Sequence, residues 1–145
     1  MIGPVHHVGV AVRRLDAALA DYRVLGFEPE STEEVLNQGV RVAFLRTGGV
    51  RIELLESLRP DGVIARFVER RGEGLHHVAF SVQDIRAEMN RLQERGLEMV
   101  DAEPRPGAHG RLVAFVHPRS AHGVLLELVQ ESTRPKSDQD SGRLG

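Results

Sequence analysis

The sequence contains no cysteine. This absence excludes disulfide bonds, thiolate nucleophiles and thiolate metal ligands, so any metal ion must be held by histidine and carboxylate side chains. The sequence also lacks an apolar run near the roughly 18 residues that a membrane-spanning helix needs. No signal peptide is expected, because a candidate strand begins almost immediately, at Val5. These absences predict a cytoplasmic protein without a membrane segment.

Charge and composition narrow the class of protein further. The formal net charge is -2 and the pI is about 6.4, which leaves none of the basic footprint that nucleic-acid binding requires. The 145 residues, 41% of them hydrophobic and 28% charged, are enough for one globular core but short for two. We expect one domain over residues 1–130, followed by a polar tail, 131–145, that is predicted to be disordered.

The first half of the chain predicts a strand, a helix, a pair of strands and a short helix. The run VHHVGVAV has the alternation of a strand, and the apolar residues after it recur at helical spacing up to Gly26, a suitable C-terminal residue. Thr47-Gly48-Gly49 is typical of a hairpin turn. In order, these elements cover residues 5–12, 15–25, 40–46, 50–56 and 61–70.

The same order of elements begins again near residue 75. His7 and His77 are 70 residues apart (77 − 7), and the helix starts and closing glycines keep this offset: Leu15 and Ile85, Gly26 and Gly96. The sequence therefore predicts an α+β fold of two tandem βαβββ modules, about residues 5–60 and 75–130. Two such modules side by side form a half-open barrel of mixed sheet, whose concave face is the natural place for a site.

Four polar residues stand at matching positions of the two repeats. His7 and His77 lie in strands beside small residues that leave room for a ligand, and Glu53 and Glu127 interrupt apolar strands, where a bare carboxylate is costly to bury. A single such residue is more often an ordinary hydrogen-bonded or surface residue, but the duplicated register favours a cation site. Two imidazoles and two carboxylates suit Mn, Co, Zn or Fe and leave positions for substrate.

The two neighbouring histidines, His6 and His76, occupy the alternate positions of the same strands. Strand alternation predicts that they point to the opposite face of the sheet. We therefore interpret them as structural residues outside the expected site.

Beyond these patterns, the sequence resembles the methylmalonyl-CoA epimerases of the vicinal oxygen chelate superfamily, which includes glyoxalase I. The resemblance covers about residues 5–130 and rests on HHVGVAV, the NQGV step, IELLESL, GEGLHHVAF, EPRPGAHG, HPRS and GVLLELV. It implies the vicinal oxygen chelate fold, an acyl-CoA substrate, a homodimer and a divalent metal, commonly cobalt, with Mn, Zn, Ni or Mg as other options. It further implies that His7, His77 and Glu127 bind the metal, with Glu53 as a fourth ligand.

The resemblance also implies a reaction, the interconversion of (2R)- and (2S)-methylmalonyl-CoA. A proton leaves the carbon between thioester and carboxylate, the metal stabilises the enolate, and a proton returns on the other face. Glu127 is the candidate acid/base on one face. Val42 stands where some relatives carry a second glutamate, so His109, in the GAHG loop, is the candidate for the other face, with metal-bound water as a substitute. The alternative for His109 is a surface contact with solvent or CoA.

Two other functions fit the same scaffold. One is a glyoxalase I-type lactoylglutathione lyase, which isomerises a glutathione hemithioacetal with the same metal chemistry, and the other is a non-catalytic protein that binds small molecules. The sequence leaves open the choice of metal and the choice between methylmalonyl-CoA and ethylmalonyl-CoA, because one methylene changes binding by only about 1 to 3 kcal/mol.

Overall fold

A computed structural model of the chain describes residues 1–132. Most of the expected tail, 133–145, lies outside the described residues. Within residues 1–132, no helix is long and apolar enough to cross a membrane. The helices and longer strands are β1 (Val5–Ala11), α1 (Leu15–Leu25), β2 (Glu28–Val35), β3 (Val40–Thr47), β4 (Val50–Ser57), α2 (Val63–Arg71), β5 (Gly74–Ser81), α3 (Ile85–Glu94), β7 (Leu112–Val116) and β8 (Leu126–Gln130), with a two-residue β6 (Arg105–Pro106).

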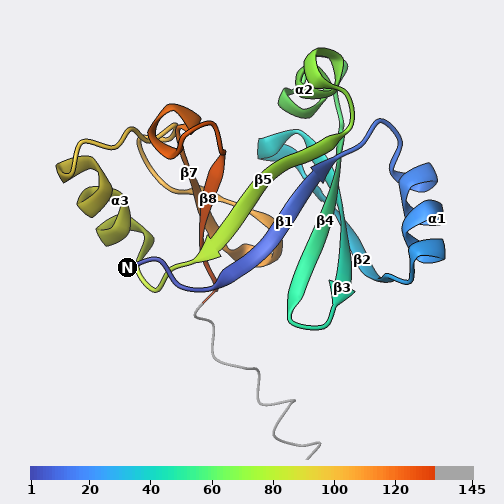
Figure 1. Cartoon of the computed structure of the whole chain (residues 1–145), viewed down its shortest axis with the longest axis horizontal. Coiled ribbons are helices and arrows are strands. Elements are labelled where there is room, and N and C mark those ends of the chain that lie inside the picture. The colour runs from blue at the N-terminus through green and yellow to red at the C-terminus, as the bar shows by residue number, and fades with distance from the viewer. Residues whose placement is uncertain (133–145) are drawn as a thin grey trace, which may run out of the picture.

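The strands form one mixed sheet of eight in the order β2-β3-β4-β1-β5-β8-β7-β6. The two first strands of the repeats, β1 and β5, pair antiparallel in the middle, and each pairs in parallel with the last strand of its own repeat, β4 and β8. Figure 1 shows the two halves fanning out from this central pair. The predicted tandem βαβββ half-barrel is confirmed.

Helices α1 and α3 cover equivalent parts of the sheet at its two ends (Figure 1). Leu15 of α1 packs with Leu54 of β4, and Ile85 of α3 packs with Leu128 of β8. Because successive strand residues point to opposite faces, the neighbours of these leucines turn to the concave face. This alternation delivers one glutamate from each repeat, Glu53 and Glu127, to the same side of the sheet.

Strand β2 has no strand-like pattern in the sequence, so no strand was expected over its residues. Its sequence, EPESTEEV, is almost entirely polar, because β2 is an edge strand with most of its residues exposed on both faces. Backbone pairing with β3, from Glu28 to Val35, holds it in place. Apolar periodicity cannot reveal a strand that buries so little.

Candidate metal centre and adjoining cavity

Three buried side chains from three strands converge near the middle of the sheet. His7 comes from β1, His77 from β5 and Glu127 from β8. The two Nε2 atoms lie 3.0 Å apart, and Oε2 of Glu127 lies 3.1 Å from Nε2 of His7 and 2.8 Å from Nε2 of His77. Three possible ligand atoms therefore form a nearly equilateral triangle.

With Glu127 ionised, as its lowered pKa indicates, protons on the two rings cannot satisfy all three atoms of this triangle. If both Nε2 atoms carry protons, their N–H groups repel each other at 3.0 Å; if only one does, the other lone pair faces the carboxylate oxygen. A divalent cation accepts all three lone pairs. Octahedral ligands at about 2.1 Å from a metal are separated by about 3.0 Å, which matches the observed edges of 2.8, 3.0 and 3.1 Å. The residues present therefore fit a metal ion.

Glu53 lies beside this triangle and not in it. Its Oε2 is 3.2 Å from Nδ1 of His7, the ring nitrogen that the triangle does not use. Both of its oxygens accept from Nη2 of Arg111, at 3.0 and 3.1 Å. Glu53 is 2% exposed, and Arg111 compensates its buried charge. In this position Glu53 orients the His7 ring, as carboxylates behind metal-binding histidines commonly do.

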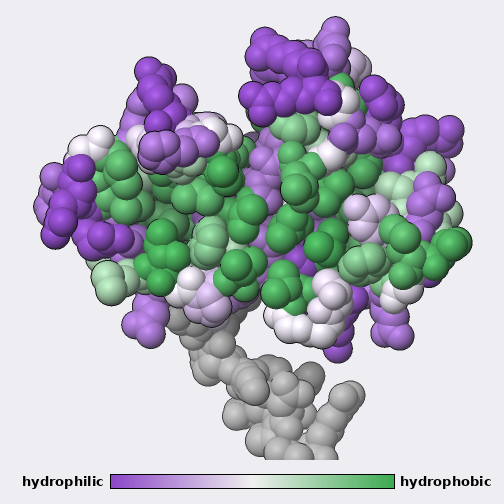
Figure 2. All heavy atoms as spheres, in the orientation of Figure 1, coloured by the Kyte–Doolittle hydropathy of each residue, from purple (hydrophilic) through white to green (hydrophobic). Residues whose placement is uncertain are grey.

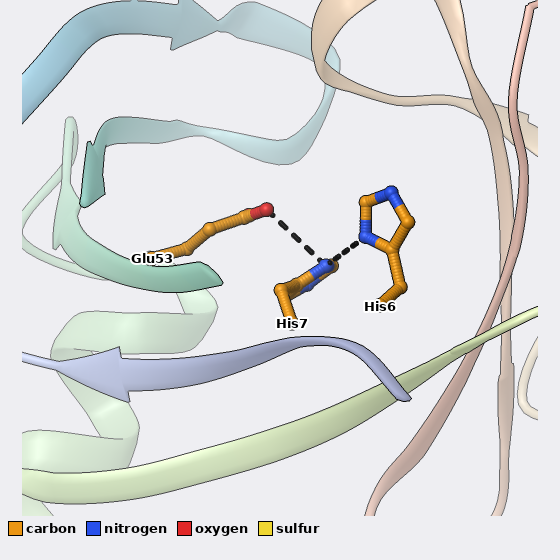
Figure 3. Close-up of side chains that lie close together, drawn as sticks. All are labelled: His6, His7 and Glu53. Carbon is orange, nitrogen blue, oxygen red and sulfur yellow. Dashed lines mark hydrogen bonds and ion pairs between the residues drawn. The ribbon is translucent and has the colours of Figure 1, made fainter. Parts of the chain in front are cut away.

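His6 and His76 do not follow the strand alternation expected from the sequence. The register between β1 and β5 shifts twice, with His6 as the extra residue of β1 and His76 as the extra residue of β5. Such β-bulges re-aim side chains. Nδ1 of His6 lies 2.7 Å from Nδ1 of His7 (Figure 3), and Nδ1 of His76 lies 3.0 Å from Nδ1 of His77. The interpretation that both lie away from the site was wrong, because each contacts a triangle histidine.

Gly9 makes room for the His77 ring. These two residues are opposite each other in the β1–β5 ladder, and a Cβ on Gly9 would lie 2.2 Å from Cε1 and 2.7 Å from Nε2 of His77. The small residues beside His7 were expected to leave room for a ligand. At Gly9 the second histidine fills that room.

A cavity of about 270 Å³ adjoins the triangle. One wall is apolar, with Val40 and Val42 of β3 and Leu55 of β4, while another carries Arg111 just before β7. The polar groups His76, His77, Glu53 and Glu127 also line it. The cavity therefore offers an apolar surface, a cation and two of the three candidate metal ligands, His77 and Glu127, within one space.

The structure does not bring His109 to this cavity. Its ring lies against the Phe44 ring, with centroids 4.4 Å apart, and its Nε2 is 3.6 Å from Oε2 of Glu33 on β2. The side chain is 43% exposed. The short loop that carries His109 turns through a left-handed backbone conformation there, φ 57°, which directs the ring outward while Ala108 and Arg111 line the cavity.

The electrostatics of the centre favour an ionised carboxylate beside neutral rings. Burial opposes ionisation of Glu127, but its hydrogen bonds with His7 and His77 outweigh burial and hold its pKa below the usual range. Burial is also the main cause that lowers the pKa of His7. The pKa of His76 falls to about 4, through burial and then the nearby His77. Neutral imidazole is the form that binds a metal.

Comparison with known proteins agrees with this arrangement. The model of the Glyoxalase/Bleomycin resistance protein/Dioxygenase superfamily matches residues 6–115. An ethylmalonyl-CoA/methylmalonyl-CoA epimerase of Cereibacter sphaeroides is 41% identical over 133 residues, which cover 90% of this chain and 99% of that protein. The chain belongs to the methylmalonyl-CoA epimerase family of this superfamily.

Solved structures of the epimerase family superimpose on nearly the whole chain. A variant of the Streptomyces coelicolor methylmalonyl-CoA epimerase in complex with 2-nitronate-propionyl-CoA gives a TM-score of 0.86 at 36% identity, covering 92% of this chain and 97% of that one. The epimerase of Mycobacterium tuberculosis gives 0.85 at 36% identity and covers 90% and 89%. The expected fold and family are therefore confirmed.

Arg111 is the cavity residue that the sequence analysis missed. It is 4% exposed although it lies in the loop that precedes β7. Matching the repeats could not reveal it, because the corresponding residue of the first repeat is the apolar Val40. The two positions correspond because each lies four residues before a phenylalanine, Phe44 or Phe115, that pairs with the glutamate of its own repeat, Glu53 or Glu127. The available signal was its place beside the GAHG motif.

Proposed function

We infer that this epimerase family member interconverts the two epimers of methylmalonyl-CoA with the help of a divalent metal ion. The observation that carries the inference is the triangle of His7, His77 and Glu127, with edges no longer than 3.1 Å, beside a cavity that His77 and Glu127 line. The chain also matches epimerases over nine tenths of its length. We propose that His7, His77 and Glu127 are the metal ligands, with Glu53 supporting His7 from behind.

A divalent cation bound there supplies a Lewis acid that stabilises negative charge developing on the substrate oxygens. The protein's own groups hold and move the proton. Glu127 stays ionised at neutral pH because its pKa is lowered, so it is able to accept the C2 proton on one face of the substrate. Its neighbours His7 and His77 fix the position of the carboxylate oxygen.

The proton donor on the second face must also reach the cavity. His109, the residue expected from the sequence, would have to leave Phe44 and Glu33 to do so. We propose instead one of two other cavity residues that are able to exchange a proton, Glu53 and His76. The variants Glu53→Gln and His76→Gln separate them: loss of inversion with retained exchange of the C2 proton identifies the donor.

A groove beside the cavity supports a coenzyme A substrate. Its volume is about 710 Å³, and Arg66, Arg70 and Arg71 of α2 line it together with His76 and Leu125, which also line the cavity. Figure 2 shows strongly hydrophilic atoms over α2. Guanidinium groups bind phosphates through paired N–H donors, so we propose that the CoA phosphates lie here while the acyl group enters the cavity.

Three finer expectations remain proposals. Cobalt is the metal that the family resemblance favours, and the homodimer and the cytoplasmic location likewise remain predictions from the sequence. Hydrophobic residues gathered across the middle of the face in Figure 2 are consistent with a dimer contact. The acyl group is proposed to be methylmalonyl, with ethylmalonyl as a second substrate because the Cereibacter sphaeroides relative is named for both.

Chiral analysis of the product tests this function. Purified protein with Co²⁺ is incubated with (2S)-methylmalonyl-CoA, and formation of the (2R) epimer is followed by a stereospecific second enzyme. A parallel incubation with methylglyoxal and glutathione tests the glyoxalase alternative. We expect the (2R) epimer to form and no lactoylglutathione; the reverse pattern would assign the protein to the lyase.

A further inference from the structure

Arg111 has unused hydrogen-bonding capacity in the cavity. Its guanidinium is buried, and only Nη2 has acceptors, the two oxygens of Glu53. Among the described residues, none accepts from Nε or Nη1, and both atoms are inaccessible to solvent. Buried guanidinium N–H groups are costly when they have no acceptor. Because Arg111 lines the cavity, its unused donors point to an anionic ligand there.

The second cavity arginine, Arg105, has one such atom, its Nε, but the rest of its side chain reaches solvent. Its side chain is 42% exposed, and its Nε lies 2.8 Å from Oδ1 of Asp101. A bound anion therefore gains less from Arg105, which is partly exposed and faces Asp101, than from Arg111. The difference between them makes Arg105 a natural control.

The position equivalent to Arg111 in the first repeat carries no charge. The residue that corresponds to Arg111 in the first repeat is Val40, which is buried and lines the same cavity with Val42 and Leu55. Two symmetry-related positions therefore present a cation and an apolar side chain to one space. A carbon that bears one carboxylate and one alkyl branch has the matching asymmetry.

We propose that Arg111 determines specificity by binding the free carboxylate of the acyl group, while the wall around Val40 accepts the alkyl branch. This inference rests on the proposed function and deepens it. Nη1 donates to the substrate carboxylate as Nη2 donates to Glu53, so one guanidinium joins the protein carboxylate to the substrate carboxylate. Charge-assisted bonds of this kind are about twice as strong as neutral ones.

Binding of two matched thioesters tests the proposal. Isobutyryl-CoA has a methyl group where methylmalonyl-CoA has its carboxylate, and calorimetry gives the affinity of each for metal-loaded and for chelator-treated protein. The chelator-treated protein isolates the contribution of Arg111 from that of the metal. We expect wild type to prefer methylmalonyl-CoA in both forms and Arg111→Met to lose about 10- to 100-fold of this preference, with affinity for isobutyryl-CoA unchanged.

Two further variants keep the test decisive. Arg105→Met should retain the wild-type preference. If Arg111→Met fails to fold because Glu53 is left without a partner, the double variant Glu53→Gln, Arg111→Met removes that charge and is compared with Glu53→Gln alone. An unchanged preference in the arginine variants would overturn the role of Arg111 while leaving the epimerase intact. Absence of binding and of C2 exchange in wild type would instead overturn the proposed function.

Discussion

The two repeats share one fold but supply different chemistry to the site. Both turn a glutamate and a histidine to the concave face, yet Glu127 of the second repeat contacts both histidines, whereas Glu53 of the first repeat contacts Arg111 and the far side of the His7 ring. The comparison shows that the backbone symmetry places the groups, while individual substitutions decide which carboxylate is free to bind a cation.

The same asymmetry appears in the strands that join the repeats. Gly9 faces His77 across the ladder, whereas the residue at the equivalent position of the second repeat, Ala79, faces His7. The Cβ of Ala79 fits beside His7, whereas a Cβ at position 9 would overlap the ring of His77. The two histidine rings are therefore packed differently although their strands match.

The largest expected effect separates the two carboxylates. Glu127→Gln removes a ligand and the proposed base, so C2 exchange should fall by about 10²- to 10⁴-fold and binding of Co²⁺ should be lost. At the metal centre, Glu53→Gln removes no ligand but weakens the support of His7, so the affinity for Co²⁺ should fall by about 10- to 100-fold. Titration of each variant with Co²⁺, followed by the absorption spectrum of the bound ion, measures the two affinities. Equal losses of affinity would contradict the different roles assigned to the two glutamates.

Gly9→Ala and Ala79→Gly test the packing of the rings. The methyl group at position 9 would displace the His77 ring, so metal affinity should fall to the level of a missing ligand. Ala79→Gly leaves His7 in place and should cost only about 0.5 to 1 kcal/mol of unfolding free energy, as glycine does within a strand. If Gly9→Ala binds Co²⁺ as wild type does, the close packing at His77 is incorrect.

The lowered pKa of His76 predicts a pH dependence of stability in chelator-treated protein. The unfolded chain takes up a proton on this residue near pH 6.5, but the folded protein takes it up only near pH 4. Titration of His76 therefore leaves the free energy of unfolding unchanged above pH 6.5. As the pH falls from 6.5 toward 4, it lowers this free energy progressively, by up to about 1.4 kcal/mol per pH unit. His76→Gln should lose less stability over this range.

Urea denaturation at several pH values measures this difference. The exposed His122, which lies outside the cavity, provides a control for the loss of an imidazole, and His122→Asn keeps a residue that tolerates its left-handed backbone. Parallel stability curves for His76→Gln and wild type between pH 6.5 and 4 would refute the prediction.

The smallest expected effect compares the two sheet-covering helices. Asp84 caps α3 by accepting from the backbone N–H of Ala87 at 3.1 Å, whereas Arg14 provides no side-chain cap for α1. Asp84→Ala should therefore cost about 1 kcal/mol, and Arg14→Asp should gain a similar or smaller amount. Thermal unfolding measures both, with Arg14→Ala as the neutral control. A neutral Asp84→Ala would show that this cap contributes nothing.

The sequence predicts the features of this fold that depend on periodicity. The constant offset between His7 and His77 is enough to find the duplicated architecture, and the polar residues Glu53 and Glu127 stand out because their strands are apolar. The triangle follows from these positions once two modules share a concave face. Edge strand β2 could not be found in this way, since solvent covers most of it.

The parts that the sequence did not predict depend on local backbone geometry. The bulges at His6 and His76 break the two-residue alternation, and no pattern in the sequence marks them. The left-handed conformation at His109 directs its ring to Phe44. Arg111 was hidden because a loop position gives no periodic signal of burial. Each of these residues lies within or next to the site, where local structure departs most from regular rules.

Proton NMR of methylmalonyl-CoA in deuterated water tests the central claim most directly, that His7, His77 and Glu127 hold a cation used to exchange the C2 proton. Spectra are recorded with metal-loaded wild type, chelator-treated wild type, the treated sample after addition of Co²⁺, and Glu127→Gln. We predict exchange at C2 in the loaded sample, its loss with chelator and in the variant, and its return with Co²⁺. Exchange that persists without metal, or in Glu127→Gln at the wild-type rate, would contradict the account.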